Sequence, residues 1–541
     1  IGWRAWPNHS ETGHMAAGVY FWHTYSFDVF HVNPPLTRII SGLPVVLSCP
    51  NYDWSSYASQ PHYRPEWGMG VAFVEANPTQ RLRWFFALGR WSLIPLLVLG
   101  GYFGYRLSLD IHGDGAAFLF LALWCFSPLL VGLGATICPD AVACSLGIVA
   151  VYLFRQWLYE PNWKRAAIAG ACLGLLPLTK LTWMIAFGIW PLIWCLWTMP
   201  IFLTRADKRS LPRPPLHQLA IILLLALFVL NMGYLFDGTF RPLGRYVFIS
   251  QLCRGQQVPD NRQMPVLGNR FAGTWAGAIP VPLPAECIQG MDTQRYDFER
   301  GLPSYLRGHW ADHGWWYYYL YALAIKEPLG TWCLVAIAIG ATVLGEGYSA
   351  QWRDEMILFV PALAILIFVS SQTGFSVHSR YVTPALPFLF VWASKVGRLF
   401  EMRPVTGRRL LMAVIVVVAL TWSVASSLTV YPHSLSYFNE LAAVLPTPAD
   451  ASYPKPGGAG NEGRSVLSTI IGGGPRHLLD SNIEWGQDLL YLKDWLEAHP
   501  EVKLDGLACC KSYPPTFAGI PEAPQPPTNW DAGPLPGWDA L

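Results

Sequence analysis

Residues 116–158 read AAFLFLALWCFSPLLVGLGATICPDAVACSLGIVAVYLFRQWL. The two apolar runs in this stretch, 116–135 and 138–158, are each long enough to cross a hydrocarbon core of roughly 30 Å. The junction Thr136-Ile137-Cys138-Pro139-Asp140 places an acidic residue between them, at the end of a membrane helix. Ionisable groups near such ends are energetically costly and are usually functional. The stretch therefore predicts membrane-spanning helices with a functional group at one membrane face.

The composition extends this prediction to the whole chain. It is 52% hydrophobic and 13% charged, whereas soluble domains carry about 25% charged residues. A net charge of +2 argues against nucleic acid as a partner. The 26 Trp and 24 Tyr residues favour membrane interfaces, and their rings also suit stacking on sugars. We expect a polytopic α-helical membrane protein with spans at residues 85–107, 116–135, 138–158, 166–179, 182–203, 216–235, 317–344, 355–371, 382–400 and 409–430.

The basic residues predict the orientation of these spans. Lys and Arg gather in alternate loops, which indicates the cytoplasmic side. These residues are Arg155, Lys164, Arg165, Arg205, Lys208, Arg209, Arg213, Arg353, Arg398, Arg403, Arg408 and Arg409. The opposite side then receives residues 1–84, the Asp140 junction, the 236–316 loop, the 378–380 loop and the tail from about 431.

We therefore expect three regions. Residues 1–84 form a first extracytoplasmic loop with a catalytic motif, residues 85–430 form the transmembrane bundle including the large 236–316 loop, and residues 431–541 form a small soluble α/β domain cut off at Leu541. Whether residues precede Ile1 stays open. Cys253 and Cys287 share one polar loop, and a disulfide between them is an open alternative if that loop faces an oxidising compartment.

Glu11 lies in the polar opening stretch Asn8-His9-Ser10-Glu11-Thr12-Gly13-His14. The predicted topology places it on the same side of the membrane as Asp140, where the two carboxylates would line one cavity. Such a cavity favours a membrane-embedded enzyme over a channel wall or a soluble hydrolase.

Several motifs resemble one family of membrane enzymes. Asn33-Pro34-Pro35-Leu36-Thr37-Arg38 resembles an element of the protein O-mannosyltransferases and of the transferases that attach aminoarabinose to lipid A. Glu11 and His14 stand where that family carries its Asp-Glu pair, and Asp140 matches the acidic residue of its second external loop. Leu178-Thr179-Lys180 and His378-Ser379-Arg380-Tyr381 are also similar to family elements. The resemblance covers about residues 1–430.

The resemblance implies a GT-C membrane glycosyltransferase that uses a polyprenyl-phosphate-linked sugar. It implies action on the non-cytoplasmic side, which in bacteria is the periplasmic face of the inner membrane. The acceptor class, whether protein, lipid or glycan, stays open. The sequence departs from the family at Ser10, which replaces the first acidic residue of the pair. This departure keeps a non-catalytic membrane subunit open as an alternative, and a transporter or flippase of a lipid-linked sugar is another.

Inverting glycosyl transfer requires a base for the acceptor hydroxyl and cations for the leaving phosphate. Glu11 is the candidate base, against the alternative of a solvated loop residue. Asp140 is expected to orient the acceptor or a cation, against the alternative of a helix N-cap. The expected phosphate-binding residues are Arg38, Lys180, Arg380 and His378, with His14 assisting proton transfer; the alternatives are lipid-facing cations and structural histidines.

We expect no metal site. His9, Glu11 and His14 cluster in the sequence, but their spacing is not the metal-binding helix signature. A divalent ion at these residues stays a minor alternative.

Overall fold

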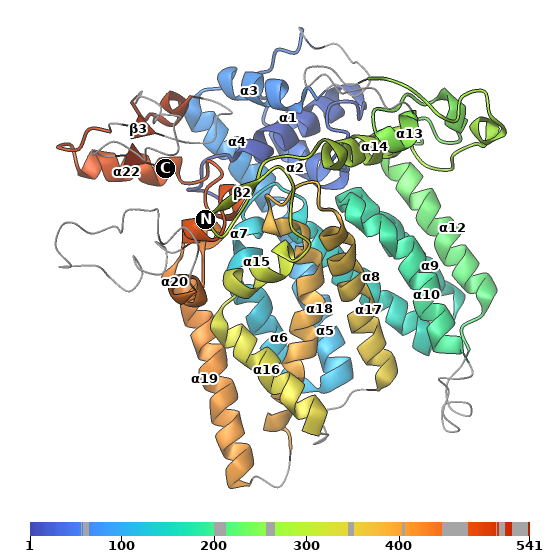
Figure 1. Ribbon diagram of the computed structural model, residues 1–541, viewed down its shortest axis with the longest axis vertical. Coiled ribbons are helices and arrows are strands. Elements are labelled where there is room, and N and C mark those ends of the chain that lie inside the picture. The colour runs from blue at the N-terminus through green and yellow to red at the C-terminus, as the bar shows by residue number, and fades with distance from the viewer. Residues whose placement is uncertain are drawn as a thin grey trace.

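The computed structural model describes the chain except for residues 56, 58–63, 200–212, 256–265, 345–350, 403–405, 446–473, 505, 508–513, 522–538 and 541. Two parts are distinguished in Figure 1: long helices that run side by side, here called the bundle, and shorter helices and loops across one end, here called the cap. Arg205, Lys208, Arg209 and Arg403 lie outside the described residues.

The bundle confirms a polytopic α-helical membrane protein. Among the described residues, six helices are long and apolar enough to cross a membrane, and two bent helix pairs would raise this number to eight. The six candidate spans are Thr79–His112, Asp140–Tyr159, Leu181–Thr198, Leu216–Gly233, Trp352–Ser371 and Gly407–Thr429. In the element numbering of Figure 1 these contain α4 (Thr79–Trp91), α5 (Ile94–His112), α8 (Asp140–Tyr159), α10 (Ala186–Thr198), α12 (Leu216–Gly233), α17 (Trp352–Ser371) and α19 (Gly407–Thr429).

Two of the expected spans are broken rather than straight. Helices α6 (Asp114–Phe126) and α7 (Pro128–Gly134) meet at 57°, and α15 (Tyr318–Lys326) and α16 (Leu329–Leu344) meet at 110°. Each break directly precedes a proline, which disfavours helical geometry in the residue before it. The two breaks contact each other, because Ser127 Oγ donates a hydrogen bond of 2.7 Å to Glu327 Oε1.

Two other expected spans differ from the prediction in length or continuity. Helix α9 (Trp163–Thr179) has 17 residues, somewhat short for an untilted span. Residues 382–400 form α18 (Leu386–Ala393) between 3₁₀ helices, of which the second is Ser394–Phe400. Apolar composition predicted the membrane location of this segment, but prolines near its start leave only a short α-helical core.

Glycine spacing explains the close pairing of α9 with α12. Gly170 and Gly174 are four residues apart and therefore lie on one face of α9. A Cβ on Gly170 would lie 2.8 Å from the Ile222 carbonyl oxygen, and a Cβ on Gly174 would lie 2.5 Å from the Ala226 carbonyl oxygen. Small residues allow such backbone approach between membrane helices. This packing holds α9 against α12 and thereby fixes the position of Lys180, the residue that follows α9.

One end of the bundle carries the predicted cytoplasmic charges. Arg155 near the end of α8 contacts Asp354 near the start of α17 at 2.7 Å. Lys164 and Arg165 begin α9, and Arg408 begins α19, at the end away from the cap (Figure 1). The alternation of basic loops therefore corresponds to one physical end of the molecule.

The cap is built mainly from the first residues of the chain and from the 236–316 region. Its helices are α1 (His9–Thr24), α2 (Leu36–Val46), α3 (Glu66–Glu75), α13 (Gln251–Arg254) and α14 (Ala285–Arg300), with a short hairpin of β1 (Ser304–Leu306) and β2 (His309–Ala311). Helices α1 and α2 cross at Gly18 and Gly42, where a Cβ on Gly18 would lie 2.3 Å from the Arg38 carbonyl oxygen.

The described part of the tail packs on both the bundle and the cap. It contains α20 (Leu441–Val444), α22 (Leu489–Ala498) and a parallel pair of two-residue strands, β3 (Gly506–Leu507) and β4 (Asp539–Ala540). Leu489 and Leu507 share a hydrophobic cluster with Trp6 and Met15. The expected division into a separate tail domain stays a prediction, and the tail and the cap share this core.

The alternative of a disulfide in the 236–316 loop is wrong. Cys253 and Cys287 are both free, and Cys287, in the first turn of α14, is buried. Burial raises the pKa of Cys287 to about 12, so the residue packs as a protonated thiol.

Candidate active site

Asp140 begins α8 where the bundle meets the cap. Residue Pro139 takes the helix cap position, and no side chain caps this end. The Asp140 side chain is 2% exposed and is directed to a cation instead, so the alternative of a helix N-cap is not what the structure shows. Its position at the first turn still favours a negative charge, because the helix dipole is positive there.

Two cations from distant parts of the chain meet this carboxylate. Lys180, directly after α9, places Nζ 2.5 Å from Asp140 Oδ1. The same Nζ donates to the Arg380 carbonyl oxygen at 3.1 Å. Arg380 belongs to the 3₁₀ helix Ser379–Tyr381, and its guanidinium lies 3.6 Å from Asp140 Oδ2. The structure thus brings Asp140, Lys180 and Arg380 together, as the predicted topology required.

This cluster has unused hydrogen-bonding capacity. Asp140 Oδ2, Arg380 Nε and His14 Nδ1 are buried atoms without a hydrogen-bond partner among the described residues. Buried polar groups are nearly always paired, so unpaired ones at one location indicate a place for a ligand or water. The three-residue cluster carries two positive charges and one negative charge, which leaves a net positive charge for an anion.

The two predicted histidines are close to the cluster but are uncharged. Burial, together with the charges of Arg38 and Arg380, lowers the pKa of His14 to about 3. Burial, followed by the charges of Arg380 and Lys180, holds the pKa of His378 well below its usual range. His378 Nδ1 shares a hydrogen bond with Ser481 Oγ. Neither ring therefore supplies a positive charge to a phosphate near neutral pH.

Glu11 is near Asp140 in space but its oxygens are occupied. Its Oε1 accepts a hydrogen bond of 2.9 Å from the Ile137 backbone N–H, which confirms that residues 11 and 140 lie on the same face. Arg90 donates to both oxygens at 2.7 and 2.6 Å, and the Asn8 backbone N–H donates to Oε2 at 3.0 Å. Glu11 is 0% exposed. These contacts are those of a structural anchor and do not support the expected role as a base.

Arg38 is also committed to the protein interior. Its guanidinium donates to the carbonyl oxygens of Phe30 at 2.6 Å and Asn33 at 3.1 Å. Burial lowers the pKa of Arg38 to about 10. The structure therefore does not bring Arg38 into the contacts of the Asp140 cluster.

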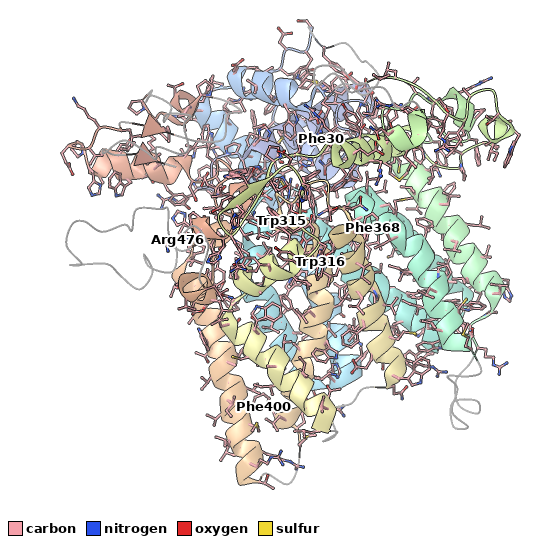
Figure 2. All side chains as sticks on the ribbon, in the orientation of Figure 1. Phe30, Trp315, Trp316, Phe368, Phe400 and Arg476 are labelled. Carbon is pink, nitrogen blue, oxygen red and sulfur yellow. The ribbon has the colours of Figure 1, made fainter. Side chains whose placement is uncertain are left out.

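An apolar groove of about 450 Å³ opens beside the cluster. It is lined by Leu181, next to Lys180, and by Tyr381, next to Arg380. The Tyr381 ring lies 5.1 Å from Lys180 Nζ and thus separates the cations from the groove. Phe368 and Met291 form other parts of the wall. Figure 2 shows Phe368, with Trp315 and Trp316, at the level where the cap meets the bundle.

The sequence did not reveal two groups at this site. Arg90 is the partner of Glu11, but it lies near the start of the expected span 85–107 with no motif around it. Trp485 of the tail lies against the Arg380 guanidinium, whose central carbon is 4.3 Å from the centre of the Trp485 ring. No motif in the sequence around Trp485 indicates this partner.

His9, Glu11 and His14 do not form a metal site. Within the described ranges, no group of three or more His, Cys, Asp or Glu side chains is arranged to hold a metal ion. His9 stacks on Trp67 with ring centres 4.1 Å apart, and Glu11 faces Arg90.

The fold and the cluster define a polytopic helical membrane protein with a buried carboxylate and two cations beneath a cap. Two solved structures are similar to it, both of ArnT from Cupriavidus metallidurans. The structure bound to undecaprenyl phosphate has a TM-score of 0.47 and 11% identity, over 99% of this chain and 87% of that one. The apo structure has a TM-score of 0.42 and 12% identity, over 96% and 81%. No family model and no curated protein matches the sequence.

Proposed function

We propose that the chain is an integral membrane glycosyltransferase that takes a sugar from a polyprenyl-phosphate donor. The observation that carries this proposal is the Asp140–Lys180–Arg380 cluster, with its unpaired buried atoms, next to an apolar groove. A donor of this class combines a long apolar chain with an anionic phosphate, and the site offers complementary surfaces for both. The family motifs around Lys180 and Arg380 favour the same activity.

The charges explain how the cluster would favour the reaction. The phosphodiester of the donor carries one negative charge, and the leaving phosphate acquires a second as the sugar departs. Lys180 and Arg380 are already held in place by Asp140, so they stabilise this developing charge with little rearrangement. The three-residue cluster has one net positive charge, which matches the donor and favours the transition state more strongly.

The apolar groove would hold the first units of the prenyl chain. Tyr381 forms part of the groove wall and lies against Lys180, so a phosphate at Lys180 and a prenyl chain in the groove would lie on either side of this ring. The site lies at the cap end of the bundle, opposite the basic residues of α9 and α19. Because Lys and Arg gather in cytoplasmic loops, the cap end is non-cytoplasmic, which in bacteria is the periplasmic side of the inner membrane. Attack opposite the phosphate inverts the anomeric centre.

The test is transfer by the purified protein in lipid vesicles. Polyprenyl-phosphate sugars are supplied with protein, lipid and glycan acceptors, and release of polyprenyl phosphate is measured. Lys180→Gln and Arg380→Gln should each lower kcat/KM roughly 10- to 150-fold, because a charged hydrogen bond contributes about 1.5–3 kcal/mol. Lys164→Gln, an exposed cation at the opposite end, is the control and should keep full activity.

Three outcomes would contradict the proposal. Wild-type turnover in both Lys180→Gln and Arg380→Gln would reject the site. Absence of transfer with every donor and acceptor would reject the activity and favour a non-catalytic subunit. Movement of the lipid-linked sugar between leaflets without transfer would favour a transporter.

A further inference from the structure

The tail segment Asp480–Asp488, here called the strap, crosses the candidate site. Asn482 accepts a hydrogen bond from the Ser379 backbone N–H at 2.9 Å and donates to the Val377 carbonyl oxygen at 2.8 Å. Its own carbonyl oxygen accepts from the buried Lys326 Nζ at 2.6 Å. Trp485 then covers one face of Arg380. The strap is thus bonded to the loop that carries Arg380 and to α15 of the bundle.

The other end of the strap is fixed to the start of the chain. The backbone N–H of His9 donates to the Trp485 carbonyl oxygen at 3.1 Å, and that of Trp6 donates to the Gln487 carbonyl oxygen at 2.9 Å. These bonds tie residues more than 470 positions apart across the site. A segment held at both ends in this way presents its side chains in fixed positions.

The first residue of the strap presents a carboxylate to solvent. Asp480 has a left-handed backbone with φ of 60°, a conformation that non-glycine residues adopt infrequently and Asp and Asn adopt most readily. Its side chain accepts a hydrogen bond from the Ser481 backbone N–H. Oδ1 lies 3.9 Å from His378 Nδ1, and the side chain is 52% exposed. The carboxylate is therefore exposed and lies beside His378, two residues before Arg380.

Arg380 interacts electrostatically with a buried carboxylate, Asp140, and with an exposed one, Asp480. Burial tends to lower the pKa of Arg380, and the charges of Asp140 and Asp480 are among the causes that raise it above its usual value. Asp140 is ion-paired with Lys180 and inaccessible, and Glu11 is enclosed by Arg90. Partial loss of hydration beside the protein raises the pKa of Asp480, against the Ser481 hydrogen bond and the Arg380 charge, which lower it. A raised pKa suits proton transfer near neutral pH.

We propose that Asp480 is the general base that activates the acceptor, and that the strap holds it beside the donor phosphate. This inference rests on the proposed glycosyltransferase function. The acceptor O–H bond breaks and its proton moves to the Asp480 carboxylate. The oxygen forms a bond to the anomeric carbon of the sugar. The bond between that carbon and the phosphate oxygen breaks, and its electron pair leaves with polyprenyl phosphate beside Arg380 and Lys180.

The decisive variant is Asp480→Asn, which preserves the size of the side chain and its tolerance of a left-handed backbone. It should lower kcat about 10²- to 10⁴-fold, the usual contribution of a positioned base. Its affinity for polyprenyl phosphate, measured by calorimetry in detergent, should stay within about twofold of wild type. Asp494→Asn is the control, because Asp494 is an exposed carboxylate of the same tail that pairs with Arg4.

A second variant tests the chemistry independently of side-chain packing. Asp480→Gly accepts the same backbone angle and leaves space for a small carboxylate, so added formate should restore part of its lost turnover. A purely structural role would give no such rescue. Turnover by Asp480→Asn equal to wild type, or loss of Asp480→Gly activity without formate rescue, would overturn the inference. In contrast, absence of turnover in the wild type would overturn the proposed function itself.

Discussion

The Glu11–Arg90 pair gives the sharpest test of whether Glu11 is an anchor or a base. Glu11 accepts four hydrogen bonds, two from Arg90 and one each from the Asn8 and Ile137 backbone N–H groups. Glu11→Gln replaces one oxygen with an NH₂ donor that would face other donors. It also leaves the buried Arg90 without its counter-charge.

Loss of one partner of a buried ion pair costs about 3–5 kcal/mol. For a chain of 541 residues the entropy of unfolding is roughly 1.1 kcal/mol/K, so we expect the midpoint of thermal unfolding, Tm, to fall by roughly 3–4 °C. The measurement is intrinsic tryptophan fluorescence of the purified protein in lipid nanodiscs during heating. Glu160→Gln is the matched control, because Glu160 pairs with Arg165 on the exposed surface, where an ion pair contributes about 0–1 kcal/mol.

The double variant Glu11→Leu/Arg90→Met separates charge from packing. Replacement of both partners by apolar residues removes the uncompensated charge, so Tm should recover part of the loss seen in Glu11→Gln. If Glu11→Gln instead kept the Tm of Glu160→Gln while losing sugar transfer, the structural role would be refuted. Glu11 would then be the base that the sequence had indicated.

Two further outcomes test the attachment of the tail and the packing of the cap. His433 Nδ1 lies 2.9 Å from Asp488 Oδ1, and this hydrogen bond raises the pKa of His433. The resulting stabilisation is complete below the unfolded pKa of about 6.5 and is lost as pH rises through the folded pKa. His433→Gln should therefore lower Tm more at about pH 5.5 than at about pH 8.5. An equal decrease in Tm at both pH values would contradict this linkage. Gly18→Ala should destabilise the protein by about 1–3 kcal/mol, because its Cβ would overlap the Arg38 carbonyl oxygen. Gly68→Ala, which meets nothing within 4 Å, should not destabilise it, and equal unfolding midpoints for the two variants would refute this account of α1 and α2.

The sequence predicted most of the bundle because its signal is local. A run such as 138–158 is apolar along its whole length, and only a membrane or a protein core accommodates it. The basic residues that alternate between runs then indicated which residues share a face. That reasoning was enough to place Asp140, Lys180 and Arg380 together before any contact was known.

The same reasoning could not identify the contacts within the site. Glu11 and His14 stand at positions that resemble the acidic pair of the family motif, yet Glu11 is enclosed by Arg90, 79 residues away, and His14 is held neutral by burial. Arg38 matched a motif and binds backbone carbonyl oxygens. Which partner a charged side chain finds depends on how distant helices pack, and no local pattern encodes that choice.

The sequence by itself determined that this is a polytopic membrane protein with polar residues gathered at one face. The transfer of an apolar segment into the membrane and the preference of Lys and Arg for cytoplasmic loops depend on each segment separately. Both can therefore be assessed from the sequence alone. Only the tertiary structure decided which carboxylate is buried and which is accessible. It placed Asp140 in an ion pair and the strap, from the far end of the chain, over Arg380. Exposure and pairing arise from contacts between segments, and these form only when the whole chain has folded.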